Sequence, residues 1–189
     1  MKEFFHKYSY SMIKMLLTQI VISIFGLVLS MATVNASSAV AIAVSIFAIL
    51  FYLFLIYTLV WEIGAKDKIS VDVGKKTYKP LTGLWMALIA NIPNIVLAVI
   101  LAAGRLFISN VDGKELNGLG IASVIANVLQ GMYFGAISAI KLPTGNLLSE
   151  MWWTYFLIVI PALVTSFLAY YLGHRNFRFF GGLANKKKS

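Results

Sequence analysis

Two asparagines and a proline interrupt an apolar run that is long enough to cross a membrane, and these residues are the first candidates for a functional site. Asn91, Pro93 and Asn94 lie within residues 84–104, which are otherwise apolar. Pro93 has no amide proton, so the carbonyl of Ile89 needs another partner inside the membrane. Asn91 and Asn94 are three positions apart and share a helix face, where their amides could line a polar cavity or coordinate a ligand. The alternative is a structural proline kink, repaired by neighbouring amides.

A second polar group lies in residues 119–140, an uncharged segment in which glycines and polar side chains dilute the apolar ones. Asn127 and Gln130 are its candidate ligand-binding amides. Small and polar residues recur every four positions from Ser123 to Ala139, so they share one helix face. One interpretation is a cavity wall opposite the amides of the preceding apolar run. The other is close helix packing, with backbones approaching at Gly131, Gly135 and Ala139.

The acidic residues and histidines lie where neither catalysis nor proton transfer is expected. The seven Asp and Glu residues lie at the ends of the apolar runs, in the loops or in the leader, whereas proton-coupled carriers normally need an ionisable group inside the membrane. The chain has no cysteine, and His6 and His174 lie near opposite ends of the sequence without the spacing of a metal site. Nucleophile-elbow and P-loop motifs are missing. We therefore expect no catalytic residue, no metal and no cofactor.

Long apolar runs must position these residues. Hydrophobic residues make up 60% of the chain and charged residues 12%, against about 25% charged residues in soluble domains. Residues 15–34, 39–61, 84–104 and 151–173 each have roughly the 20 residues that a membrane crossing needs. Residues 119–140 form a fifth, weaker run. The sequence therefore predicts a single membrane domain, an all-α integral membrane protein built as a small helical bundle.

Clusters of basic residues predict the topology. They lie in a leader with aromatic residues at 1–14, expected at the membrane interface, in a loop at 64–83, and in a tail at 174–189. Basic segments next to membrane spans stay in the cytoplasm, which places all three there. Because both termini are then cytoplasmic, the number of crossings is even. We predict four transmembrane helices, with residues 119–140 as a re-entrant or interfacial helix on the outer side; the alternative is five transmembrane helices.

The net charge of +9 lies next to apolar runs, which indicates contact with anionic lipid headgroups and not with nucleic acid. The loop at 64–83 could also dock another membrane protein or a cytoplasmic protein of acidic character. Within it, apolar and polar residues alternate over residues 69–73 before Gly74, which predicts a short hairpin. In the tail, the candidate lipid contacts are Arg175, Arg178, Lys186, Lys187 and Lys188.

Three stretches resemble a known group of sequences. They read W-E-I-G-A-K-D-K-I over residues 61–69, K-P-L-T-G over 79–83 and A-N-I-P-N over 90–94. They are similar to an uncharacterised group of small multi-spanning proteins of low-GC Gram-positive bacteria. The resemblance implies a bacterial plasma membrane and brings no activity with it. In length alone, the chain is also similar to the substrate-binding subunits of energy-coupling-factor vitamin transporters, which have six spans.

These features predict a non-enzymatic polytopic membrane protein, either a transport-related component or a subunit of a larger membrane complex. The alternative is a small-molecule carrier or channel that acts alone. A membrane-embedded enzyme acting on lipid would need a nucleophile beside a base, and the sequence offers no such pair. The four amides of the apolar runs form a polar seam: Asn91, Asn94, Asn127 and Gln130. Whether this seam encloses a continuous water-filled path or a closed pocket would discriminate between the two leading hypotheses.

Overall fold

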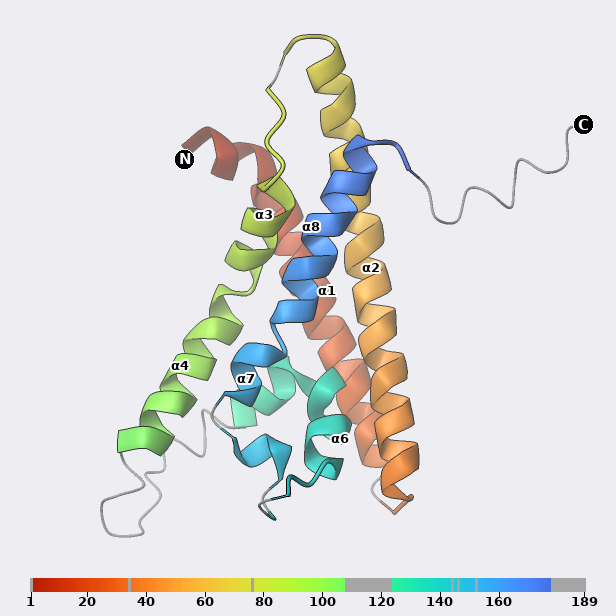
Figure 1. Ribbon diagram of the computed structural model, residues 1–189, viewed down its shortest axis with the longest axis vertical. Helices are drawn as coiled ribbons and strands as arrows, with labels where there is room; N and C mark the ends of the chain where they lie inside the picture. Colours follow the sequence, from red (N-terminus) through yellow and green to blue (C-terminus); the bar gives the residue numbers. More distant parts are fainter. Residues whose placement is uncertain are drawn as a thin grey trace, which may run out of the picture.

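The computed structural model of the chain describes residues 2–33, 35–75, 77–107, 124–143, 145, 147–151 and 153–177. Two long helices, α1 (Lys2–Ala32) and α2 (Ser38–Asp72), run antiparallel and form the frame of a helical bundle (Figure 1). The basic leader is helical and continuous with the first apolar run. With 35 residues and a rise of 1.5 Å each, α2 is roughly 52 Å long, whereas the hydrocarbon core of a bilayer is about 30 Å thick. It is therefore longer than one crossing requires.

The third apolar run is bent where the sequence predicts an interruption. Helix α3 (Thr82–Ala90) ends before Asn91, helix α4 (Ile92–Phe107) follows directly, and their axes differ by 56°. Pro93 lies in the first turn of α4, where its missing N–H removes no intrahelical hydrogen bond. The bend thus places the proline at a position that a helix tolerates.

The fourth and fifth apolar runs are each divided into shorter pieces. Residues 124–129 are helical, the chain turns at Gln130, and α6 (Gly131–Ala139) follows. At nine residues α6 is roughly 14 Å long, less than half of the bilayer's hydrocarbon thickness. After the short 3₁₀ helix η1 (Leu148–Glu150), the last run begins as α7 (Thr154–Leu157) and continues as α8 (Ile160–His174). The described part of residues 119–140 is therefore two short helices and not one straight span.

The helices pack around a core of tyrosine, methionine and aliphatic side chains. Helix α8 lies along α2 and α3, α6 packs against both α1 and α2, and α4 leans away from the frame and contacts α7 (Figure 1). Buried residues of α2 recur every four positions and so share one face. They are Ala48, Tyr52, Ile56, Val60 and Gly64. Opposite them, Met86, Met132 and Tyr170 are almost fully buried and fill the interior.

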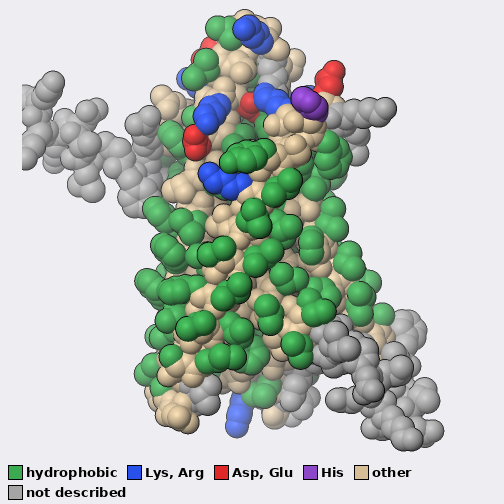
Figure 2. Space-filling model, turned by 180° about the vertical axis from the view of Figure 1, so that it is seen from behind, with side chains coloured by type: hydrophobic (Ala, Val, Ile, Leu, Met, Phe, Trp, Pro, Cys, Tyr) green, Lys and Arg blue, Asp and Glu red, His purple; other side chains and the backbone are tan. Residues whose placement is uncertain are grey.

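The outer surface of the bundle is apolar along most of its length. Figure 2 shows a broad band of apolar side chains, with charged side chains gathered over one end. Large apolar residues that are about half exposed or more include Val21, Phe47, Leu50, Val99 and Val164. Within the described residues, three helices are long and apolar enough to span a membrane: α1, α2 and the α7–α8 pair. The bent pair α3–α4 adds a fourth if it counts as one span.

The hairpin predicted at residues 69–73 is wrong, because α2 continues to Asp72. The helix ends where the backbone N–H of Val73 donates to the carbonyl of Ile69 and that of Gly74 to the carbonyl of Val71, at 3.2 and 2.9 Å. Gly74 has φ +72°, a conformation that glycine adopts without a steric penalty. The connection between α2 and α3, residues 73–81, lies outside the two helices, and the structure describes its residues 73–75 and 77–81.

Candidate functional site

The amides at the bend between α3 and α4 are buried and bond to each other. Asn91 is 3% exposed and Asn94 1%. The side-chain amide of Asn91 donates to the carbonyl of Ala87 at 2.9 Å, and that of Asn94 donates to the Asn91 side-chain oxygen at 3.0 Å. The Asn94 oxygen has no partner among the described residues. The two amides therefore supply hydrogen bonds at the break between the helices, and the Asn94 side-chain oxygen is the acceptor that remains.

The amides of the second polar group are placed separately from the first. Asn127 accepts a hydrogen bond from the Tyr155 hydroxyl at 3.2 Å. Gln130 lies buried at the turn before α6, and its side-chain oxygen lacks a partner in the described part of the chain. Among the described residues, hydrogen bonds join Asn91 to Asn94 but join neither of them to Asn127 or Gln130. The bonding therefore organises the predicted seam as two polar groups.

The small residues of α6 lie where helix backbones approach closely. A Cβ atom on Gly131 would collide with the carbonyl oxygen of Ser23 on α1, and one on Gly135 would collide with the Ser45 hydroxyl on α2. The Ser23 hydroxyl donates to the carbonyl of Leu129 at 2.6 Å, which ties the turn before α6 to α1. Ala139 is partly buried at the end of α6. This arrangement corresponds to the packing interpretation of the small-residue stripe.

Only one of the predicted lipid contacts in the basic tail lies within the described residues. Arg175 is exposed just after α8, with its guanidinium 4.5 Å from the ring centre of Tyr171. The other four residues lie outside the part of the chain that the structure describes: Arg178, Lys186, Lys187 and Lys188.

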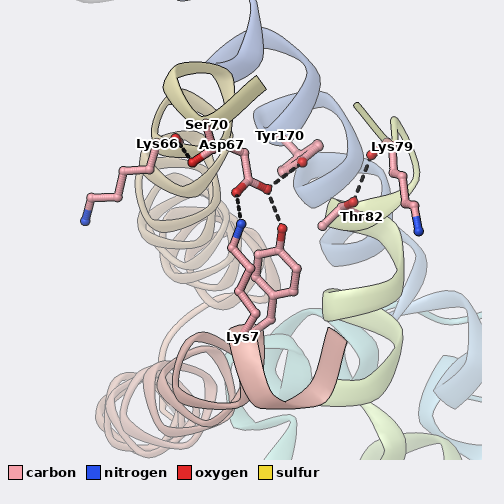
Figure 3. Close-up of polar contacts among 8 residues, drawn as sticks. Lys7, Lys66, Asp67, Ser70, Lys79, Thr82 and Tyr170 are labelled. Atoms are coloured by element: carbon pink, nitrogen blue, oxygen red, sulfur yellow. Dashed lines mark hydrogen bonds and ion pairs between the residues drawn. The ribbon is translucent and has the colours of Figure 1, made fainter. Parts of the chain in front are cut away.

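A buried carboxylate at the charged end of the bundle links three helices. Asp67 of α2 is 3% exposed, and its Oδ1 atom lies 2.7 Å from the ammonium of Lys7 on α1 (Figure 3). Its Oδ2 atom accepts hydrogen bonds from the hydroxyls of Tyr8, also on α1, and of Tyr170 on α8, the latter at 2.7 Å. Burial of a charge is costly unless it is paired and hydrogen-bonded, and this carboxylate has both kinds of partner.

Glycines allow the three helices to meet at this carboxylate. Gly64 lies one turn before Asp67, and a Cβ atom there would collide with the carbonyl oxygen of Tyr170. Gly173 is similarly close to the backbone of Trp61. Because neither position has a side chain, α8 lies close enough to α2 for the Tyr170 hydroxyl to reach Asp67.

The sequence patterns do not single out Asp67, because it lies within the predicted loop at 64–83. The signal that could have found it is the buried face of α2, which continues from Ile56 and Val60 through Gly64 to Asp67 at helical spacing. Extension of the helix past Gly64 would have placed this carboxylate among buried neighbours. A buried acid then requires a cation or hydroxyl donors from another helix.

Two cavities flank the Asp67 cluster, and Lys7 and Tyr8 line both of them. One, of about 430 Å³, lies between the first turns of α1, the end of α2 and the 73–81 connection. The other, of about 250 Å³, lies between α1 and α2 and is lined by Lys14 and Lys66 among others. Lysines thus contribute to both cavities.

The connection between α2 and α3 is held against α8 by aromatic contacts. The Tyr78 ring lies 3.9 Å from the His174 ring and is stacked parallel to Tyr170, with ring centres 6.4 Å apart. Burial raises the pKa of the Tyr78 hydroxyl; nearby Tyr171 raises it further, while Arg175 opposes the shift. The phenol is therefore neutral at physiological pH, as expected for a ring that serves as a packing contact.

The chemistry that this end of the bundle supports is binding of negatively charged groups. Among the described residues, no three His, Cys, Asp or Glu side chains gather in a way that could hold a metal ion. The buried carboxylate is already paired, while several lysines around it are exposed.

Comparison of the chain with protein-family models, with curated proteins and with solved structures found no match in any of the three.

Proposed function

We propose that the chain is a multi-pass protein of a bacterial plasma membrane with four crossings, formed by α1, α2, the α3–α4 pair and the α7–α8 pair. The two short helices within residues 119–140 form a re-entrant segment on the outer side. Support for this topology comes from the exposed lysines and arginine at the end of the bundle where α2 stops, above an apolar surface (Figure 2). Such a charge asymmetry favours a cytoplasmic location for that end.

Cysteine labelling tests this topology, since the chain contains no cysteine of its own. We expect an impermeant thiol reagent to label Ser37→Cys and Lys141→Cys in intact cells, with Lys75→Cys at background until the cells are permeabilised. All three positions are exposed at the surface of the bundle, so access depends on the side of the membrane. Protection of Lys141→Cys together with labelling of Ser37→Cys would instead indicate that residues 119–140 cross the membrane.

We infer that the protein acts as a non-enzymatic subunit of a larger membrane complex. The observation that carries this proposal is the projection of α2 beyond the apolar band, which presents Lys66 and Lys68 near its end. Lys66 is 72% exposed and pairs with Glu62 at 2.7 Å. Tyr52, Met86 and Met132 fill the interior of the bundle. This packing favours binding of a partner protein at the surface over passage of a solute through the centre.

A size measurement tests the component role. We expect the protein, gently extracted from its native membrane with its lipid shell, to migrate as a species well above the 20.9 kDa of one chain. The double variant Lys66→Glu/Lys68→Glu should lose most of the associated mass, because reversed charges repel an acidic partner. Lys141→Glu, at the opposite end, is the matched control and should retain it. A wild-type chain that migrates alone would contradict the proposal.

A carrier or channel that acts alone is the second candidate, and the two helix breaks favour it. Discontinuous helices in transporters place polar groups and helix ends at a substrate site near the middle of the membrane. Here one break lies at Asn91 and another at Gln130, and the side-chain oxygens of Asn94 and Gln130 are buried without partners among the described residues. Solute flux through liposomes that contain the purified chain alone would favour this candidate over the component role.

A further inference from the structure

We propose that the larger cavity at the charged end binds a phosphate group, carried either by an anionic lipid headgroup or by a soluble phosphate ester. This inference goes beyond the component role and does not depend on it. The cavity lies between the first turns of α1 and the connection from α2 to α3 (Figure 3 shows Lys7, Lys79 and Thr82 in this region). Its volume of about 430 Å³ falls within the range of small-molecule sites, about 300–1,000 Å³.

Local structure brings the cations of the cavity together. The left-handed turn at Gly74 directs the chain back from the end of α2, so that Lys75 lines the cavity. The Tyr78 ring is held against α8, and the residues on either side of it, Thr77 and Lys79, line the cavity. The connection is therefore anchored on one side while its polar residues contribute to the cavity on the other.

The charges of the lining favour an anion. Among the described lining residues, Lys7, Lys75 and Lys79 are basic and Glu3 is acidic. Lys7 is paired with the buried Asp67, so Lys75 and Lys79, both exposed, are the cations of the described lining that are available to a ligand. A lysine ammonium binds phosphate as a point charge. Because the charge of Lys7 is already balanced by Asp67, the two ammonium groups of Lys75 and Lys79 suit the charge of a phosphate mono- or diester.

The start of α3 adds a favourable dipole. Thr82, the first residue of α3, lines the cavity, and this helix has no side-chain cap at its N-terminus. Backbone N–H groups at a helix N-terminus carry partial positive charge and favour bound anions. The Thr82 hydroxyl donates to the Lys79 carbonyl at 2.8 Å, which fixes the lysine's backbone beside the helix start.

The position of the cavity fits a headgroup at the membrane surface. Phe4 lines it from α1, and Phe5 next to it is 44% exposed, so aromatic rings lie beside the lysines. Aromatic residues concentrate at the level of lipid headgroups, and basic pockets between membrane helices on the cytoplasmic side bind anionic headgroups. A soluble phosphate ester would reach the same lysines from the cytoplasm.

The test measures binding to the purified full-length chain in neutral detergent by native mass spectrometry. The lipid probes are dioleoyl phosphatidylglycerol and uncharged dioleoylglycerol, with inorganic phosphate as the soluble probe. We expect phosphatidylglycerol or phosphate to bind wild type, and the Lys75→Gln/Lys79→Gln variant to bind at least ~10-fold more weakly. The matched control Lys66→Gln/Lys68→Gln removes two charges from the same end outside this cavity and should change affinity less than ~3-fold.

The probes also identify the source of the phosphate. Retention of phosphatidylglycerol in the presence of millimolar inorganic phosphate assigns the cavity to a lipid headgroup, while displacement by phosphate assigns it to a soluble ester. Equal losses in the two double variants would overturn the proposal, because surface charge alone would then explain binding. Equal binding of dioleoylglycerol would overturn it too. Loss of the larger complex in the size measurement has no bearing on these outcomes, since the detergent-purified chain is tested alone.

Discussion

Replacement of Asp67 by alanine is expected to destabilise the folded bundle by about 2–4 kcal/mol. The carboxylate is the common acceptor for Lys7, Tyr8 and Tyr170, so its removal leaves one ammonium and two hydroxyls without their partner. The Lys7 side chain is 45% exposed and can regain water, which keeps the expected loss below that of a fully buried ion pair. The measurement is reversible unfolding in mixed micelles with increasing sodium dodecyl sulfate.

Two comparisons separate this cluster from ordinary surface charge. Glu62→Ala removes an exposed carboxylate from an ion pair with Lys66 one turn earlier on α2 and should cost no more than about 0.5 kcal/mol. Asp67→Asn keeps an acceptor for the tyrosine hydroxyls while it removes the charge, so it should recover part of the loss. If Asp67→Ala were as mild as Glu62→Ala, the carboxylate would not be what joins α1, α2 and α8.

The Asp67 cluster also shows where prediction from the sequence stops. Long apolar runs predicted the helices, because burial and hydropathy repeat locally, and Pro93 between two asparagines predicted the bend at Asn91. The alternation over residues 69–73 predicted a hairpin, yet the helix continues there. What decides between the two is the contact of Asp67 with residues 60 and 103 positions away, which local patterns do not contain.

The same limit of local patterns applies to the last two apolar runs, residues 119–140 and 151–173. In the last run, Pro161 lies in the first turn of α8, and the helix before it ends at Leu157. In residues 119–140, the helix breaks at Gln130, a residue with no strong tendency to break helices. The serine and glycine contacts that α1 makes on either side of that turn explain the break better than local preference. Close packing was one of two interpretations of the small-residue spacing, and neither interpretation included the turn beside it.

The second large effect is expected at that surface. Gly131→Leu should destabilise the bundle by about 3 kcal/mol or more, since a Cβ atom there meets the backbone carbonyl of Ser23, which cannot move aside as a side chain can. On the other side of this contact, Gly26 of α1 lies equally close to the backbone of Met132. The two glycines therefore set the distance between α1 and α6. Unfolding in mixed micelles measures the loss.

Helix propensity makes the smaller substitution the more stringent test of this contact. Alanine favours a helix over glycine by about 1 kcal/mol, so Gly131→Ala would stabilise α6 if its surroundings were open. We expect net destabilisation instead, because the collision outweighs that gain. Ala43→Leu, which adds a larger side chain at an exposed position of α2, is the matched control and should stay within about 0.5 kcal/mol of wild type. A neutral or stabilising Gly131→Ala would mean that α6 does not rest closely on α1 at this position.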